Sequence, residues 1–207
     1  ATKVVGEITH PVFDVNVLRQ DFPILTEEVY GKPFTYLDSA ASAQKPLQVI
    51  EAISKVYSTE YSNVHRGVHY MSQKTTDAME EAREKIRSFV NASSIREIIF
   101  VRGATEGINL VASSWGRRNL SAGDEIILTV LEHHSNIVPW QLMAEEVGAS
   151  LKVVPIDRDG VLDIDTYSNL LSDKTKFVAV THVSNALGTI LPVTELIRLA
   201  HERGAKV

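Results

Sequence analysis

The stretch EIILTVLEHHSNIVPW, residues 125–140, decides the fold. Its first six residues, 125–130, form a β-branched apolar run with the length of a strand that is covered on both faces. Polar residues follow at once, and Pro139 stands where a helix is expected to begin, because the first helical turn does not need the N–H that proline lacks. The stretch therefore predicts a strand, a polar loop and a helix, which is the repeating unit of α/β proteins with a parallel sheet.

The same unit recurs along the chain. Strand-like apolar runs occur at 34–38, 97–102, 125–130, 151–156 and 177–182. Helical patterns lie at 46–60, 70–90, 106–116, 138–147, 164–171 and 193–203, with a short additional helix expected after Asp14. We therefore predict an α/β fold whose mostly parallel sheet is covered by helices on both faces.

The composition excludes several classes of protein. Of the 207 residues, 44% are hydrophobic and 23% are charged, which is typical of a globular protein. The net charge of −5 argues against a surface for nucleic acid or for anionic lipid. The chain has no cysteine, so these residues hold no disulfide framework and no thiolate metal site. We expect a cytoplasmic protein with no nucleic-acid and no membrane partner, with a plastid or another organelle as the alternative.

The last residues repeat an earlier pattern. VGASLKVV, residues 147–154, ends a helix with Gly-Ala and continues as a strand. RGAKV, residues 203–207, begins in the same way but holds only two residues of the strand. A strand of two residues would leave the edge of its neighbour unpaired within a covered sheet. We therefore expect the chain to be truncated within this domain.

Candidate functional residues follow three of the predicted strands. In FVRGATEGINLV, residues 100–111, Gly103 opens a helix that begins near Thr105. Free backbone N–H groups and the helix dipole make such a helix start a binding site for phosphate. The alternative is that Thr105 only caps the helix. The stretch matches neither the dinucleotide fingerprint nor the P-loop.

Two adjacent histidines, His133 and His134, follow the strand at 125–130. One interpretation is that an imidazole stacks on a flat cofactor ring. A metal site would add Glu132 and His182, but adjacent histidines rarely point the same way and the usual histidine spacings are missing. The remaining alternative is that these are loop residues that cap the next helix.

The third candidate, Asn185, lies after the strand at 177–182. Its amide can donate and accept hydrogen bonds in one plane, which suits a ring hydroxyl, although it is also a typical turn residue beside Gly188. Because ligands of open α/β sheets bind at the carboxyl ends of the strands, we expect the three candidates to lie at one edge of the sheet.

Two earlier stretches also hold candidates. YLDSAASAQKP, residues 36–46, contains small residues that allow a ligand or a second chain to approach closely. NVHRGVHYMS, residues 63–72, contains His65 and Arg66, which are suited to meet a carboxylate, since arginine offers a bidentate fork. The alternative for both is a solvated surface loop.

Taken together, YLDSAASAQKP, VHRGVHYMS, FVRGATEGINLVA, EHHSNIVPWQ and THVSNALGTILP occur in an order and spacing that resemble the group II (Suf-type) cysteine desulfurases of the class V aminotransferase family. The resemblance runs from about residue 15 to residue 207. It implies a fold-type I transferase that uses pyridoxal 5′-phosphate (PLP) and is normally a homodimer. Residues 1–30 would belong to the small domain, and residues 31–207 would form the first part of the PLP-binding large domain, incomplete at its C-terminal end.

The resemblance also implies roles for single residues. Thr105 and the N–H of Ala104 would hold the phosphate, His133 would stack on the ring and act in catalysis, and Asn185 would reach the ring hydroxyl. No metal is implied. Many relatives carry a second threonine in place of Ala104, so phosphate binding is expected to weaken slightly at most. The residues implied for the substrate are Ala40, Ala41, His65 and Arg66.

The reaction implied by the resemblance converts L-cysteine to L-alanine and leaves an enzyme-bound persulfide, which a sulfur-acceptor protein receives for iron–sulfur cluster assembly. The acidic partner of the cofactor nitrogen, the Schiff-base lysine and the nucleophilic cysteine of the family would lie beyond Val207, so this chain alone is expected to be inactive. The alternatives are a selenocysteine lyase, which acts on L-selenocysteine, another class V PLP enzyme, or a non-catalytic binding or dimerisation module.

Overall fold

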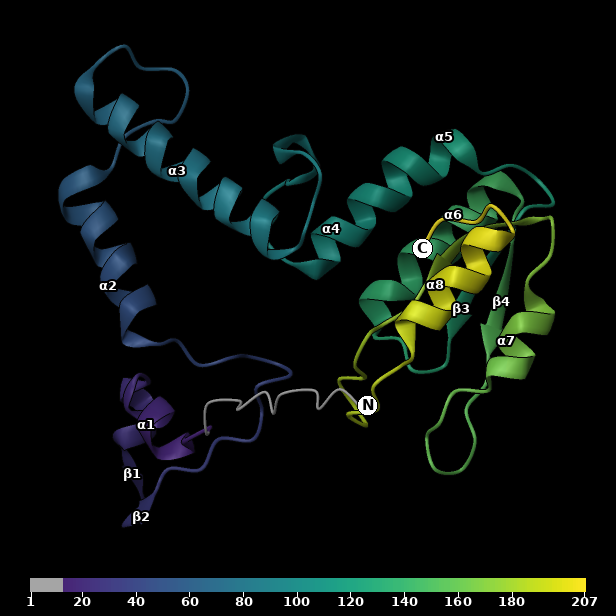
Figure 1. Cartoon of the computed structure of the whole chain (residues 1–207), viewed down its shortest axis with the longest axis horizontal. Coiled ribbons are helices and arrows are strands. Elements are labelled where there is room, and N and C mark those ends of the chain that lie inside the picture. Colours follow the sequence, from purple (N-terminus) through teal and green to yellow (C-terminus); the bar gives the residue numbers. More distant parts are fainter. Residues whose placement is uncertain (1–12) are drawn as a thin grey trace, which may run out of the picture. The chain divides into compact units, whose positions relative to one another are not determined.

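The structure, a computed structural model, describes residues 13–207 and divides into two compact units (Figure 1). The first extends to Ile98 and the second runs from Ile99 to Val207, and each is described by itself. The expected boundary at residue 30 concerns the domains of the family and stays a prediction. Within the described part of the chain, no helix is long and apolar enough to span a membrane.

Helices dominate the first unit. Asp14 caps α1, as expected, because its Oδ1 accepts a hydrogen bond from the N–H of Asn16 at 2.9 Å. The helices predicted at 46–60 and 70–90 are confirmed. The helical segments are α1 (Val15–Gln20), η1 (Pro23–Thr26), α2 (Leu47–Lys55), η2 (Val56–Glu60), α3 (Tyr70–Phe89) and η3 (Ile95–Glu97).

The strand predicted at 34–38 is wrong, because the chain forms a short hairpin just before it. Strands β1 (Glu28–Val29) and β2 (Lys32–Pro33) pair antiparallel. Between them, Tyr30 and Gly31 both have positive φ, 55° and 70°, as a two-residue hairpin turn requires. Tyrosine is not a typical residue for such a turn, so the hairpin could not be predicted from its turn residues.

The strand predicted at 97–102 is also wrong. The 3₁₀ turn η3 ends at Glu97, and residues 98–101 have no regular secondary structure. An apolar run becomes a strand only where a second backbone pairs with it, and no described strand pairs with this segment.

A three-stranded parallel sheet forms the centre of the second unit. The strands are β3 (Glu125–Thr129), β4 (Ser150–Val154) and β5 (Thr175–Ala179), in the order β4-β3-β5. On the far side of β5, Lys206 forms a parallel bridge, and the N–H of Val178 donates to its carbonyl at 2.8 Å. The strand expected to start at Lys206 is therefore represented by its first residue pair with β5.

Helices cover both faces of this sheet, as predicted (Figure 1). Ile127 faces the side packed by α7 (Ile164–Leu170) and α8 (Val193–Glu202). Its neighbours Ile126 and Leu128 face the opposite side. That side is packed by α6 (Val138–Val147) together with the continuous segment of α4 (Ala104–Val111), η4 (Ala112–Gly116) and α5 (Arg117–Asn119). Because both faces are buried, the strands read as unbroken apolar runs.

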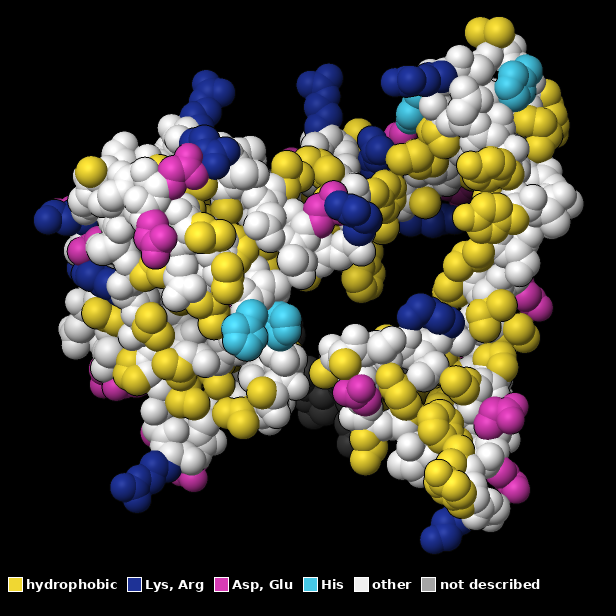
Figure 2. All heavy atoms as spheres, turned by 180° about the vertical axis from the view of Figure 1, so that it is seen from behind, with side chains coloured by type: hydrophobic (Ala, Val, Ile, Leu, Met, Phe, Trp, Pro, Cys, Tyr) yellow, Lys and Arg dark blue, Asp and Glu magenta, His cyan; other side chains and the backbone are white. Residues whose placement is uncertain are grey.

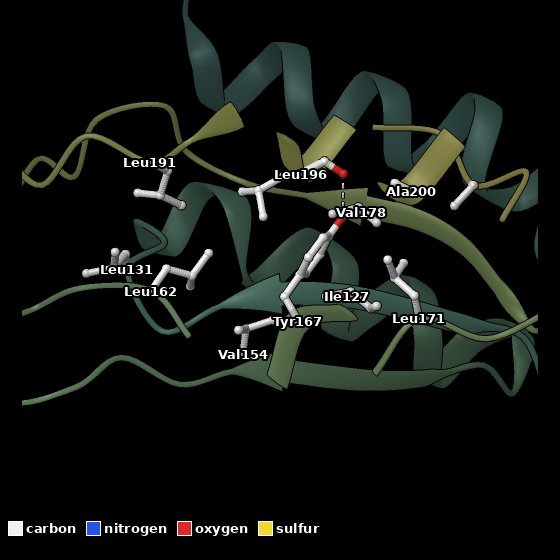
Figure 3. Packing of buried hydrophobic residues seen from close by; sticks show 11 residues of the cluster. Ile127, Leu131, Val154, Leu162, Tyr167, Leu171, Val178, Leu191, Leu196 and Ala200 are labelled. Carbon is white, nitrogen blue, oxygen red and sulfur yellow. Dashed lines mark hydrogen bonds between the residues drawn. The ribbon is translucent and has the colours of Figure 1, made fainter. Parts of the chain in front are cut away.

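Tyr167 lies at the centre of the core on the α7–α8 side (Figure 3). Its ring is fully buried, and its hydroxyl donates to the carbonyl of Leu196 at 2.8 Å, as the dashed line shows. This bond ties α7 to α8. Tyr167 therefore packs as an aromatic core residue whose one polar atom is hydrogen-bonded, and it holds the helix layer on the sheet.

Candidate functional site

The second unit carries three candidate groups: the start of α4, the loop after β3 and the turn after β5. Gly103 is the N-cap of α4, and no side chain caps this helix start. The φ of Gly103 is 167°, which is extended backbone that any residue adopts, and a Cβ there would meet no atom within 4 Å. The helix therefore begins at a residue with open space on its side-chain position and without a side-chain cap.

Thr105 is the second residue of α4, so it is not the N-cap, and the capping alternative is wrong. Its side chain is exposed and makes no hydrogen bond within residues 13–207. Glu106 instead accepts from the N–H of Arg102 at 2.6 Å, and this hydrogen bond holds the pKa of Glu106 below its ordinary value. The Thr105 hydroxyl and the N–H of Ala104 thus remain available at the positive end of α4.

His133 lies in the loop that follows β3, and the next turn orients its ring. Its Nδ1 accepts from the N–H of Ser135 at 3.2 Å and lies 2.9 Å from the Ser135 hydroxyl. Since Nδ1 accepts the backbone hydrogen bond, the ring proton of the neutral imidazole is on Nε2. The ring of His134 meets it edge-on, with centroids 5.9 Å apart. The exposed His133 ring therefore has one face and Nε2 available.

Helix α4 and the His133 loop lie side by side. The 3₁₀ turn η5 (His134–Asn136) packs against α4 and against the start of α6. The helix that carries Thr105 and the turn that follows His133 therefore pack against each other.

Asn185 occupies a turn after β5 that a buried serine organises. The Ser184 hydroxyl accepts from the N–H groups of Ala186 and Leu187 at 3.3 and 3.2 Å. Gly188 follows with φ of 74°, which closes the turn. Asn185 itself is exposed and makes no side-chain hydrogen bond within the described chain. The turn interpretation is therefore correct, and the amide is still available to a ligand.

Sequence reasoning considered Glu132 only as a metal ligand and missed that its buried carboxylate connects these loops. Glu132 is only 8% exposed. Its Oε1 accepts from the Thr129 hydroxyl at 2.7 Å and from the N–H of Thr181 at 2.9 Å, and its Oε2 accepts from Asn136 at 2.7 Å. The available signal was its position, an acidic residue directly after a buried strand. Because Glu132 is occupied in this way, it does not serve the metal site considered above. In the residues that the structure covers, no cluster of His, Cys, Asp or Glu could hold a metal ion.

An apolar hollow of about 280 Å³ lies beside β5 and α4. Ile108, Trp140 and Phe177 are among its walls. Thr105, His133 and Asn185 do not line it. The hollow lacks the convergent polar groups that orient a ligand, so we place the candidate site at the strand ends instead.

The other predicted residues belong to the first unit. Ala40 and Ala41 lie in an exposed turn, where the N–H of Ala41 donates to the carbonyl of Asp38 at 3.1 Å. Their methyl groups leave the adjacent surface open, as expected for small residues.

His65 and Arg66 lie in a loop that is fixed on the start of α3. The buried Ser72 hydroxyl accepts from the N–H of Gly67 at 3.0 Å and donates to the carbonyl of Asn63 at 2.7 Å. The Nε2 of His65 lies 3.1 Å from Glu80. Arg66 is exposed. The loop is therefore ordered by hydrogen bonds and is more than a solvated connection.

Comparison with known proteins fits this arrangement. Residues 35–207 match the family described as Aminotransferase class-V. The chain belongs to the class V aminotransferase family. A cysteine desulfurase of Synechococcus elongatus is 56% identical over 195 residues, which are 94% of this chain and 31% of the relative. A cysteine desulfurase of Escherichia coli is 54% identical over 196 residues, which are 95% of this chain and 48% of the relative.

A solved structure gives the same result for the fold. The apo structure of a cysteine desulfurase from Thermococcus onnurineus superposes with a TM-score of 0.85 at 36% identity, over 94% of this chain and 46% of that one. The chain thus spans about half the length, or less, of the family members to which it is most similar here. The fold is that of a PLP-dependent class V enzyme, with the α/β architecture and parallel sheet that the sequence predicts.

Proposed function

We propose that this chain is the PLP-binding part of a Suf-type cysteine desulfurase. The complete enzyme would convert L-cysteine to L-alanine and pass the sulfur, as a persulfide, to an acceptor protein for iron–sulfur cluster assembly. The observation that carries the proposal is the start of α4, which no side chain caps, on a helix that packs against the turn after His133. The identity of 54% and 56% to proteins named cysteine desulfurase supports the choice of reaction.

The residues at the start of α4 fit the phosphate of PLP. The Ala104 N–H and the Thr105 hydroxyl would donate to its oxygens, and the helix dipole would stabilise the negative charge. PLP supplies an electron sink when bound. The protein supplies binding and orientation, and the free space around Gly103 leaves room for an anion.

His133 and Asn185 would position the ring. The ring of His133 would stack on the pyridine, and its Nε2 would hold or transfer a proton near the reacting atoms. Asn185 would bind the ring hydroxyl through its amide. Both side chains are exposed at the strand ends, so a flat ligand can reach them.

Residues of the first unit would bind the amino-acid substrate. Arg66 would meet the substrate carboxylate with its guanidinium, and His65 would lie near the entrance. Ala40 and Ala41 would line the space for the small side chain of cysteine.

An exposed apolar face on α2 supports the expected homodimer. Ile50 and Ile53 of α2 are 43% and 55% exposed, and Tyr57 of the following turn η2 is 72% exposed. Figure 2 shows hydrophobic side chains gathered along this helix. A face of this kind is typical of a surface that a protein partner covers. We assign it to the second copy in the dimer, and we place residues 1–30 in the small domain, residues 31–207 in the large domain, and the enzyme in the cytoplasm.

The proposal is tested on the protein in its full length, incubated with PLP and L-cysteine. We expect the protein to take up PLP, to release alanine, and to transfer sulfur to a thiol acceptor. L-alanine in place of L-cysteine is the control without a sulfur to release. If the full-length protein binds PLP but forms no alanine from L-cysteine, the proposed reaction is wrong.

A further inference from the structure

We propose that Glu132 is a positioning residue that fixes the His133 loop and the Asn185 loop to each other. The inference rests on the proposed function for the roles of His133 and Asn185, but not for the contacts themselves. Glu132 directly precedes His133 in the chain. Its carboxylate accepts a hydrogen bond from the N–H of Thr181, which lies four residues before Asn185. One carboxylate thus joins the two segments that would hold the cofactor ring.

The burial of this carboxylate is costly unless its oxygens are satisfied. Glu132 is 8% exposed, and no Lys, Arg or His of the described chain forms an ion pair with it. Its three hydrogen-bond donors are all neutral: Thr129 at the end of β3, Asn136 before α6, and the backbone of Thr181 after β5. Burying a carboxylate without a cation destabilises the folded protein unless hydrogen bonds offset the loss of hydration. The carboxylate therefore acts by fixing the relative positions of these three segments.

The carboxylate also fixes the direction of the hydrogen bonds around it. Because a carboxylate only accepts, Asn136 turns its NH₂ toward Glu132. The Oδ1 of Asn136 then accepts from the indole N–H of Trp140 at 3.0 Å. Trp140 is buried in the core, so the chain of bonds connects the loop to a rigid element. The turn that orients His133 lies between Glu132 and Asn136.

This chain of bonds predicts a specific weakness of Glu132→Gln. The glutamine oxygen can keep the bonds from Thr129 and Thr181, but its NH₂ would face the NH₂ of Asn136. If Asn136 rotates, its own NH₂ faces the N–H of Trp140 instead. One pair of donors is left opposed in either case, and an unsatisfied buried donor is costly. The loop is then expected to shift, although the size of the side chain is unchanged.

The matched control is Glu125→Gln, at the other end of the same strand. Glu125 is also largely buried, with Ser172 at 2.6 Å and Lys152 at 2.8 Å from its Oε2. It lies at the amino end of β3, away from the strand ends that carry the candidate site. This variant therefore measures what the loss of a buried carboxylate does to the sheet alone.

The experiment compares both variants with wild type in the full-length protein. Hydrogen exchange over residues 181–185, measured without PLP, is expected to quicken in Glu132→Gln and to stay unchanged in Glu125→Gln. The dissociation constant for PLP is expected to rise about tenfold in Glu132→Gln only, which is the effect of losing one buried hydrogen bond. The visible absorption band of bound PLP is expected to shift in that variant as well.

Rescue by a second substitution gives an independent test. In Glu132→Gln/Trp140→Phe, Asn136 can rotate without placing its NH₂ against the indole N–H. The rise in the PLP dissociation constant caused by Glu132→Gln is therefore expected to be smaller in the Trp140→Phe background than in wild type. If Glu132→Gln does not fold, Thr129→Val removes one donor and is expected to quicken exchange over 181–185 in the same way. The inference is overturned if exchange and PLP affinity of the Glu132 variant match those of Glu125→Gln. If wild type binds no PLP, the proposed function fails, while the exchange data still decide the positioning role.

Discussion

At the scale of single residues, the two adjacent histidines differ in what surrounds them. Nδ1 of His133 is engaged by Ser135, which leaves its Nε2 and one ring face available, whereas His134 begins η5 and meets His133 edge-on. We therefore propose the ring-binding role for His133 and not for His134.

His133→Ala is therefore expected to weaken PLP binding by about 10-fold to 100-fold, since it removes about 1.4–3 kcal/mol of stacking and desolvated contact. Turnover with L-cysteine should fall as well. His134→Ala is the matched control and should retain PLP affinity within a factor of about three, because its loss removes only an edge contact. Titration of the full-length variants with PLP measures both. Equal effects of the two substitutions would contradict the assignment.

Tyr167 gives a second test at the scale of one residue. Burial raises the pKa of Tyr167 to about 12, from the ordinary 10.0. Because the folded protein holds the proton more tightly than the unfolded chain, the stabilisation is fully present below pH 10 and is lost as the pH rises toward 12. Tyr167→Phe removes both the titration and the bond to Leu196, at a cost of about 1–2 kcal/mol at neutral pH.

The measurement is the free energy of unfolding of wild type and Tyr167→Phe between neutral and alkaline pH. The stability advantage of wild type should shrink as the pH rises from 10 to 12. A constant difference over this range would show that Tyr167 ionises as readily in the folded state as in the unfolded one.

The site residues also differ in whether the sequence alone could predict them. His133 and Asn185 could be proposed because each follows a predicted strand that the structure confirms, whereas Thr105 rests on the glycine that opens α4, because the strand predicted before it is absent. The connecting role of Glu132 could not be assigned, since its partner Thr181 lies 49 residues further along the chain and only the folded sheet brings the two together. A buried polar network is a property of tertiary structure, and no local pattern encodes it.

At the scale of elements, two of the helix–strand connections on this sheet begin with a left-handed glycine or contain one near the helix end. Gly148 and Gly204 have φ of 76° and 74° and follow α6 and α8. Both conformations are left-handed, which favours glycine at the end of a helix. Their surroundings differ. A Cβ on Gly148 would lie 3.1 Å from the Cβ of Ala122, whereas a Cβ on Gly204 would meet no atom within 4 Å.

Gly148→Ala is accordingly expected to destabilise the protein more than Gly204→Ala. Backbone strain costs each variant about 1 kcal/mol, and the close contact adds to this cost only at Gly148. Chemical denaturation of the full-length variants gives the two free energies of unfolding. A Gly204 variant that loses as much stability as the Gly148 variant would show that the contact with Ala122 relaxes at no cost.

Predictions from the sequence succeed for elements that are paired or covered within the described chain. The strands at 125–130, 151–156 and 177–182 and the helices around them are confirmed because periodicity, proline and glycine agree with their packing. The strands at 34–38 and 97–102 are wrong because apolar composition does not supply a partner backbone. Pairing is non-local, so a propensity for strand is not sufficient to make one.

At the scale of the whole molecule, the exposed face of α2 bears on the expected dimer. The face contains Ile50 and Ile53 and continues to Tyr57 in η2, while Glu51 lies on α2 and is polar and exposed. A lysine in place of Ile53 would place an unpaired charge in an apolar interface, which opposes association. Lysine at Glu51 changes the charge of the helix more strongly but leaves the apolar face intact.

Ile53→Lys is therefore expected to shift the full-length protein from dimer toward monomer, and Glu51→Lys to leave it dimeric. Sedimentation analysis over a range of protein concentrations measures the dissociation constant of each variant. We expect an increase of at least about 100-fold for Ile53→Lys, as for the burial of one unpaired charge costing about 3 kcal/mol. An unchanged constant would mean that another surface forms the dimer.

The central claim, that the strand ends of the second unit bind PLP, is tested most directly by an experimental structure of the full-length protein with PLP. We predict phosphate oxygens within hydrogen-bond distance of the Ala104 N–H and the Thr105 hydroxyl, with the ring against His133 and its hydroxyl at Asn185. PLP bound elsewhere, or a phosphate held without any contact to the start of α4, would contradict the account.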